Sequence, residues 1–325
     1  MSSLEKNTVR TVRVRSTVKE QPPVKGRAYK GLSTVNPNNK SYALYDIGLI
    51  KQDLLNHFHI RQGEKLENPE FGTIIWDVLF EPLTDSLKQA VENSDRNQDY
   101  AARDNSRHPY ETLSFFRISP EMDVLELAAG GGWYTEILAP YLKDSGTLTV
   151  SHYNPEAGAY FKRSRDAFEK KVSSNPLFQG VSVVTAEVPP TQPYVAPASK
   201  DLVLTFRNLH NWLARDAMES VMLEAYNALR PGGYFGVVEH RAPEDATLEF
   251  MQTSGYVSQS LAIQAAESAG FALVASSEIN ANAKDTKDHP KGVWTLPPSL
   301  RLKDENRQKY LEVGESDRMT LLFMK

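Results

Sequence analysis

From Pro109 onward, short apolar runs alternate with stretches of helical hydrophobic spacing, and this alternation most constrains the fold. The stretches with helical spacing include Trp133–Leu142, Ala157–Lys171 and Ala214–Leu229. Such alternation is typical of strand–helix–strand units, in which parallel strands form a sheet covered by helices. The sequence therefore predicts an α/β fold with a doubly wound, mostly parallel sheet. The strands are expected at Val124–Leu127, Thr147–Val150, Val181–Thr185, Leu202–Phe206 and Tyr234–Glu239.

Composition excludes several classes of protein. Apolar residues make up 40% of the 325 residues and charged residues 24%, which excludes a wholly disordered chain. No apolar run approaches the roughly 18 residues of a membrane helix, and the basic N-terminus lacks the apolar core of a secretory signal. We therefore expect a cytoplasmic protein without a membrane partner. The absence of cysteine excludes disulfides, thiolate metal sites and cysteine nucleophiles.

Charge is distributed unevenly along the chain. Residues 1–30 carry eight Lys or Arg against two Asp or Glu, although the whole chain has a net charge of −4. We interpret residues 1–30 as a basic flexible arm, which either stays solvated or docks on an acidic partner. The polar stretch of residues 92–108 is interpreted as a junction. Three parts are therefore predicted: the arm, a small and mainly helical segment over residues 31–91, and an enzyme-sized domain over residues 92–325.

The turn of small residues at Ala128–Gly132 lies between a predicted strand and an amphipathic helix. Small residues let the backbone approach a ligand closely, and a helix N-terminus offers free N–H groups. A glycine-rich turn alone is also compatible with a tight strand–helix connection. Its position directly after an apolar strand favours the ligand site.

Four segments of the chain, together with the turn at Ala128–Gly132, resemble a known protein family. Glu126 precedes glycines at Gly130 and Gly132, while Ala128 stands where a first glycine is usual. This arrangement resembles the first motif of class I S-adenosylmethionine-dependent methyltransferases. Over residues 92–325 the chain looks most similar to a bacterial group of uncharacterised predicted methyltransferases. The segments that carry this resemblance are Arg107–Leu113, Gly131–Glu136, Val238–Pro243 and Asp285–Pro290.

The resemblance implies a Rossmann-like fold, S-adenosylmethionine as the cofactor and methyl transfer to an unidentified acceptor. Family members usually end the second strand with an acid that binds the ribose, whereas this chain has Ser151–Asn154 there. His152, Asn154 and Glu156 remain the alternatives for that contact. Glu187, after the third strand, is expected to contact the adenine amine. The expected cofactor contacts are Glu126, Ala128, Gly130, Gly131, Gly132, His152, Glu187 and Asn208.

Three histidines follow predicted strands: His152, His210 and His240. Ligands of doubly wound sheets gather at the carboxyl ends of the strands, so these side chains are expected near the site. A single histidine is more often structural, but three at neighbouring strand ends favour a site. We predict His210 or His240 as a general base, oriented by Glu239 or Asn208.

A metal site is the competing use of histidine and carboxylate side chains. The sequence has no His-x-His or His-x₃-His spacing in this region, so no metal is expected. Nothing in the pattern names the methyl acceptor, and nucleic acid is not indicated. Residues 282–301 are rich in loop-forming residues and hold Trp294, which fits either a lid over the substrate or a surface excursion. Arg318 is expected to pair with a nearby acid or to stay in solvent.

A second resemblance lies in the N-terminal third. The segments Ile50–Leu55, Arg61–Lys65, Pro69–Gly72 and Leu79–Leu83 resemble the baseplate wedge and lysozyme-like family of contractile phage tails. That family's small domain is a structural connector, and its strand-rich second half is absent from this chain. The resemblance implies baseplate proteins as partners and a host-cytoplasmic or virion-associated location. The alternative function is therefore a tail baseplate structural protein that carries a methyltransferase-like binding or vestigial domain.

Overall fold

The computed structural model describes residues 30–32, 43–45 and 86–325. Two short strands, β1 (Lys30–Leu32) and β2 (Ala43–Tyr45), pair antiparallel. The remaining described residues belong to a separate unit, Leu83–Lys325. The motifs that resemble the baseplate family, and nearly all of the predicted basic arm, lie outside the described residues. The connector role and the three-part division therefore stay predictions.

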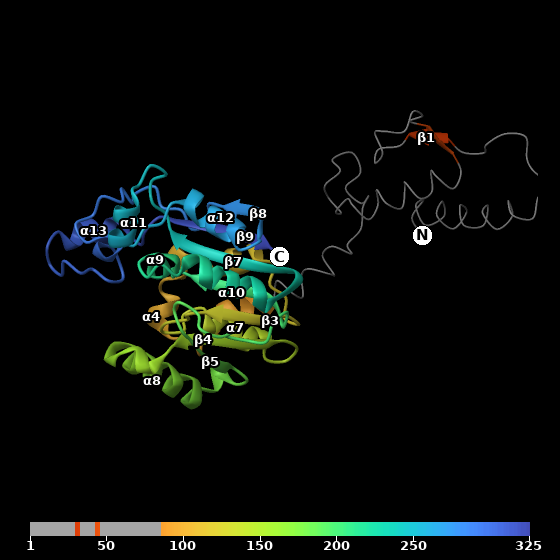
Figure 1. Ribbon diagram of the computed structural model, residues 1–325, viewed down its shortest axis with the longest axis horizontal. Helices are drawn as coiled ribbons and strands as arrows, with labels where there is room; N and C mark the ends of the chain where they lie inside the picture. Colours follow the sequence, from red (N-terminus) through yellow and green to blue (C-terminus); the bar gives the residue numbers. More distant parts are fainter. Residues whose placement is uncertain (1–29, 33–42, 46–85) are drawn as a thin grey trace, which may run out of the picture. The chain divides into compact units, whose positions relative to one another are not determined.

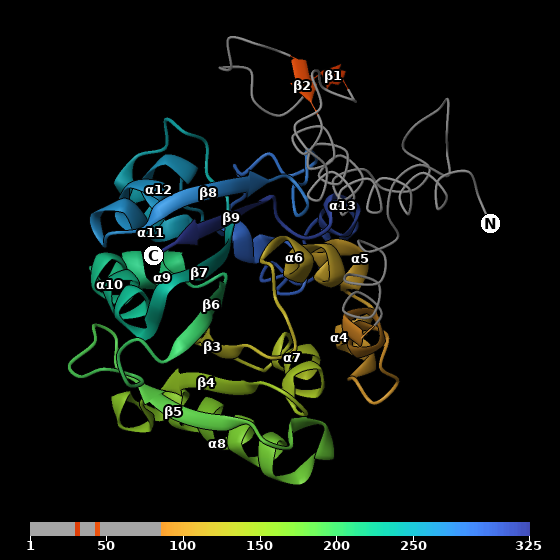
Figure 2. The same ribbon diagram turned by 90° about the vertical axis from the view of Figure 1, so that its right-hand side faces the viewer.

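A seven-stranded sheet runs through the larger unit in the order β5-β4-β3-β6-β7-β9-β8 (Figures 1 and 2). The strands from β5 to β7 are parallel, and β9 is antiparallel to both β7 and β8. The prediction of a doubly wound, mostly parallel sheet is confirmed. The strands are β3 (Asp123–Leu127), β4 (Thr147–Tyr153), β5 (Ser182–Ala186), β6 (Lys200–Phe206), β7 (Leu229–His240), β8 (Ala272–Ser277) and β9 (Arg318–Met324).

Helices cover both faces of the sheet because successive strand residues point to opposite sides. Leu125 and Leu127 pack with α10 (Met218–Ala228) and α12 (Gln259–Ser268). Val124, which alternates with them, packs with α6 (Pro109–Phe115), α7 (Thr135–Leu142) and α8 (Ala159–Ser174). Figure 2 shows α10 and α12 on one side of the sheet and α6 and α7 on the other.

The polar composition of residues 92–108 suggested a junction, but the structure shows that these residues are more than a plain linker. They form α4 (Gln98–Ala101) and α5 (Asp104–Arg107), with Arg96 and Arg107 buried. Trp133 donates its indole N–H to the Tyr100 carbonyl, 3.0 Å away, which ties α4 to the turn after β3. This segment therefore belongs to the wall of the site described below.

The remaining elements lie in the connections. Residues 86–91 are helical, and Leu87 and Ala90 are buried in the same core as α6 and α7, so this end of the predicted N-terminal segment packs on the sheet unit. In the described part of the chain, no helix is long and apolar enough to cross a membrane. The other short elements are η1 (Pro155–Ala157), η2 (Pro176–Phe178), α9 (Leu209–Leu213), α11 (Leu248–Ser254), η3 (Gly292–Thr295) and α13 (Arg307–Val313).

Candidate active site

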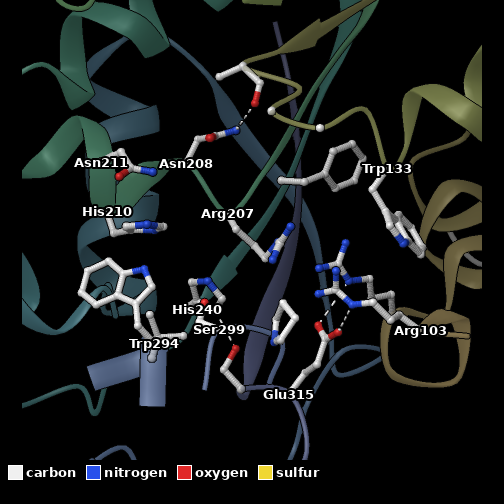
Figure 3. A pocket seen from close by; sticks show the side chains of 18 of the residues that line it. Arg103, Trp133, Arg207, Asn208, His210, Asn211, His240, Trp294, Ser299 and Glu315 are labelled. Atoms are coloured by element: carbon white, nitrogen blue, oxygen red, sulfur yellow. Dashed lines mark hydrogen bonds and ion pairs between the residues drawn. The ribbon is translucent and has the colours of Figure 1, made fainter. Parts of the chain in front are cut away.

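Two cavities open at the carboxyl ends of the parallel strands. The main cavity, of about 320 Å³, is lined by Ala128–Gly131 after β3, by residues that follow β6, and by the end of β7 (Figure 3). The side cavity, of about 240 Å³, lies at the ends of β4 and β5. Tyr153 lines both, so the two cavities are neighbours. This is the edge where ligands of doubly wound sheets bind.

The turn after β3 brings backbone directly to the main cavity. Ala128 has φ of +50° and Gly130 has φ of +59°, so both adopt the left-handed conformation. The alanine therefore keeps the backbone shape that glycine usually provides, although its Cβ makes that shape less favourable. A Cβ on Gly131 would lie 2.5 Å from the Tyr100 hydroxyl, so the end of the Tyr100 side chain would have to shift to admit one. The small residues of the turn leave its backbone open to the main cavity.

Two of the predicted cofactor contacts support the turn from behind. Glu126 is 2% exposed, and the Thr135 hydroxyl donates to it at 2.6 Å. Burial raises the pKa of Glu126 to about 7. His152 Nδ1 accepts the Tyr153 N–H at 2.9 Å, so Nε2 carries the proton and donates to the Gly130 carbonyl at 3.1 Å. Burial lowers the pKa of His152. Among the residues that line either cavity, neither Glu126 nor His152 is present.

The remaining predicted cofactor contacts divide between the two cavities. Asn208 lines the main cavity and donates from Nδ2 to the Leu127 carbonyl at 3.1 Å, which joins the ends of β3 and β6. Glu187 lines the side cavity, where its Oε1 accepts from Asn154 Nδ2 at 3.1 Å. Gly132 packs against the Phe168 ring rather than lining a cavity. Asn154, one of the three alternatives for the ribose contact, is thus beside Glu187.

The three predicted catalytic residues form one cluster at the ends of β6 and β7. His210 lines the main cavity, and its Nδ1 donates to Glu239 Oε1 at 3.0 Å (Figure 3). Glu239 is fully buried and also accepts the backbone N–H groups of Leu209 and His240, at 2.5 and 2.8 Å. These bonds fix the carboxylate, which in turn fixes the ring of His210. The Nε2 atom of His210 is left for a group in the cavity.

His240 also lines the main cavity, with its ring centroid 5.4 Å from that of His210. Its Nδ1 shares a hydrogen bond of 2.5 Å with the Ser316 hydroxyl. Burial, together with the neighbouring His210 and Arg207, holds the pKa of His240 well below its usual range. His240 is therefore neutral at physiological pH, and His210 is the better placed of the two as a base.

The same cluster has the spacing of a metal-binding group. His210, Glu239 and His240 each offer one ligand atom, and these atoms lie within 4.8 Å of one another. Both oxygens of Glu239 already accept hydrogen bonds. Arg207 is also close enough to His240 to lower its pKa. Fixed cations and an occupied carboxylate oppose the binding of a divalent ion.

Residues 282–301 form a wall of the main cavity. Val293, Trp294 and Ser299 line it, and the Trp294 ring meets the His210 ring edge-on with centroids 5.9 Å apart (Figure 3). The segment is anchored by Asp285, whose buried carboxylate accepts from the Tyr256 hydroxyl and faces His289 Nε2 at 2.8 Å. Of the two interpretations from sequence, a cover over the site fits these contacts better than a surface excursion.

Sequence reasoning missed an arginine group that lines the main cavity: Arg103, Arg107 and Arg207. Arg103 and Arg107 contact Glu315 through Nε, at 2.7 and 3.2 Å. Arg318 is buried and pairs with the same carboxylate at 3.1 Å, which confirms the pairing alternative for that residue. Arg107 begins one of the motif segments, and Arg207 directly follows a predicted strand. These two positions were the features of the sequence that could have pointed to the arginine group.

Comparison with known proteins agrees with this fold. Residues 125–237 match the family model described as a methyltransferase domain. The matched stretch begins in β3 and ends in β7, so it contains the glycine turn, the strands on both sides of β3, the residues that line the side cavity and half of those that line the main cavity. No curated protein sequence matches the chain.

The chain is also similar to solved methyltransferase structures. A SAM-dependent methyltransferase from Aquifex aeolicus is 14% identical, with a TM-score of 0.47, over 74% of this chain and 97% of that one. An S-adenosylmethionine-dependent methyltransferase from Mesorhizobium loti is 12% identical, with a TM-score of 0.42, over 66% and 97%. A further SAM-dependent methyltransferase, from Methanosarcina mazei, is 11% identical, with a TM-score of 0.44, over 66% and 96%.

Proposed function

We propose that the protein transfers a methyl group from S-adenosylmethionine to an acceptor held in the main cavity. The observation that carries this proposal is the position of the two neighbouring cavities at the strand ends of a methyltransferase domain. S-adenosylmethionine is the cofactor of such domains, and when bound it supplies a methyl group activated by a sulfonium. The acceptor is not identified by the fold.

The residues present suit this cofactor. An elongated nucleoside ligand needs two connected spaces, and Tyr153 joins the main and side cavities. The backbone of Ala128–Gly131 lines the first space without side chains beyond a methyl group. In the side cavity, Glu187 supplies carboxylate oxygens and Asn154 an amide, which are suitable partners for ribose hydroxyls and a ring amine.

The protein's own contribution is positioning and proton removal. Glu239 orients His210, so that His210 Nε2 receives the proton that a hydroxyl or amine acceptor loses. Trp294, Pro297 and Pro298 line this side of the main cavity with apolar surface, which disfavours water beside His210. Asn208 holds the ends of β3 and β6 together, which fixes the distance between the glycine turn and His210.

Calorimetric titration of S-adenosylhomocysteine, the demethylated cofactor, tests this proposal. Wild-type protein is expected to bind it, and Gly130→Leu is expected to weaken binding about tenfold or more because the side chain enters the cavity. Gly180→Leu is the matched control, since both glycines have positive φ and open space at the Cβ, but Gly180 precedes β5 at the opposite end of the strands. Absence of binding to wild type, or equal binding by all three proteins, would contradict the proposal.

A further inference from the structure

Four arginines from three parts of the chain meet around one carboxylate beside the main cavity. Arg103 precedes α5 as its N-cap residue and Arg107 ends that helix, while Arg207 follows β6 and Arg318 begins β9. In the described part of the chain, Glu315 forms ion pairs with three of them, Arg103, Arg107 and Arg318. Four guanidinium groups against one carboxylate leave three positive charges in excess. Figure 3 shows Arg103 and Glu315 on the opposite side of the view from His210, with Arg207 between them.

Several donors of this group have no acceptor. Arg107 is 1% exposed, and its Nη1 and Nη2 are buried with no hydrogen-bond partner among the described residues; the same is true of Arg103 Nη2. Both residues line the main cavity. Buried donors are nearly always paired, and a charged donor is the costliest to leave unpaired. The unpaired groups therefore point to a ligand that supplies acceptors.

The guanidinium groups are held in place rather than free to turn outward. Arg107 stacks on the Trp133 ring, with its Cζ 4.6 Å from the ring centroid. Arg318 donates to the Ser106 carbonyl, which ties β9 to α5. Planar guanidinium groups fixed in this way bind carboxylate or phosphate oxygens in pairs. The cluster is thus preorganised for an anion.

Electrostatics agrees with the geometry. Burial, followed by repulsion from Arg207, lowers the pKa of Arg107 to about 9. Burial and the neighbouring Arg318 lower the pKa of Arg207 to about 10, even though Glu315 acts in the other direction. An anion placed in the main cavity relieves both desolvation and repulsion.

Resting on the proposed function, we infer that the methyl acceptor is an anionic small molecule whose carboxylate or phosphate is bound by Arg103, Arg107 and Arg207. S-adenosylmethionine itself is a poorer explanation for the cluster. It carries a sulfonium and an ammonium against one carboxylate, so its net charge is positive and three excess cations repel it. An acceptor anchored at the arginines extends toward His210, where its reactive hydroxyl or amine loses a proton.

The test uses inorganic phosphate and malonate as probes, titrated by calorimetry into full-length protein saturated with S-adenosylhomocysteine. At least one probe is expected to bind wild type, and Arg107→Gln and Arg207→Gln are each expected to weaken that binding about tenfold or more. Arg117→Gln is the matched control, because Arg117 is exposed and donates to the Tyr234 hydroxyl away from the cavities. It is expected to bind the probe as wild type does.

The other outcomes are equally decisive. If neither probe binds wild type, the anion site is refuted. If the arginine variants lose S-adenosylhomocysteine affinity instead, the arginines hold the cofactor's carboxylate, and this inference fails while the proposed function stands. If wild type binds no S-adenosylhomocysteine, the proposed function fails, and the same probes titrated into the free protein judge the anion site alone. Arg207 has no ion pair with a described residue, so its variant keeps the test valid if Arg107→Gln does not fold.

Discussion

His210 donates its Nδ1–H to Glu239 across 3.0 Å, and Glu239 is held in turn by backbone N–H groups at the start of α9. A histidine fixed in this way keeps one tautomer, with Nε2 free to accept a proton from a group in the cavity. The same arrangement accounts for the burial of a carboxylate that contacts no solvent.

Glu239→Gln is expected to lower kcat by about 100-fold or more. Both oxygens of Glu239 accept N–H groups, so an amide has to turn its NH2 toward one of these donors, and a neutral amide does not stabilise protonated His210. KM is expected to change little, since Glu239 does not line the cavity. Steady-state kinetics with a pH profile separates this positioning role from a structural one. Glu224→Gln serves as the control. Glu224 is also a buried acid, but it lies on α10 and accepts the backbone N–H of Tyr194. Unchanged kcat in Glu239→Gln would contradict the assignment.

Glu126 is expected to make stability fall as the pH rises from about 4.5 to about 7. Burial raises its pKa to about 7 in the folded protein, so the folded state binds a proton that the unfolded state has already lost. The loss is complete above the folded pKa and amounts to about 3 kcal/mol. Glu126→Gln removes this pH dependence, because an amide does not titrate. Its oxygen still accepts a hydrogen bond from the Thr135 hydroxyl, so the packing is retained. Urea unfolding at pH 5 and pH 8 measures it, with exposed Glu249→Gln as the control. An equal pH dependence in wild type and Glu126→Gln would refute the assignment.

Glu315 is expected to act in the opposite direction, at lower pH. Burial alone would raise its pKa, but Arg107 and Arg318 lower it to about 2. Its contribution is therefore fully present above the unfolded value near 4.5 and is lost as the pH falls toward 2. Glu315→Gln removes it at every pH and leaves four arginines without a counter-charge, at a cost of about 3–5 kcal/mol. Thermal unfolding at pH 7 with and without phosphate measures this, and phosphate is expected to restore part of the loss. A Glu315→Gln protein as stable as wild type would show that the cluster is not desolvated.

Trp294 is expected to control access of water to His210. Trp294→Ala removes the ring that meets His210 edge-on and the surface on which Arg301 stacks at 4.5 Å. We expect a KM for the acceptor about tenfold higher and a lower kcat, whereas Trp294→Phe keeps an aromatic wall and most of the activity. Kinetics of the two variants makes the comparison. If Trp294→Ala and Trp294→Phe have the same KM and kcat, residues 282–301 do not cover the site.

The sheet was predictable from sequence because buried parallel strands are continuous apolar runs between helical patterns. The ends of the strands were less predictable. The run at Thr147–Val150 continues as a strand to Tyr153, and this extension decides which side chains reach the cavities. Tyr153 lines both cavities while His152, one residue earlier, points to the opposite side and supports Gly130. Because successive side chains of a strand point to opposite faces, an error of one residue in the sequence-based prediction exchanges the side chains that line a cavity for those that do not.

The arginine cluster was not predictable from local pattern. Arg103 and Glu315 are 212 residues apart in sequence and meet only because α5 packs beside the start of β9. Residues 92–108 have the polar composition of a linker. Their helices are short and bury arginine rather than apolar side chains, so they show little apolar periodicity. The histidine–carboxylate cluster was accessible to sequence reasoning because His210 follows β6, Glu239 and His240 end β7, and these two strands are neighbours in the sheet.

The most direct test of the account is transfer of tritium from methyl-labelled S-adenosylmethionine to a small-molecule extract, followed by separation on an anion-exchange resin. With wild type, the label is predicted to appear in a product that the resin retains, and His210→Asn is predicted to reduce that signal about 100-fold. Full turnover by His210→Asn, or label found only in products that the resin does not retain, would contradict the account.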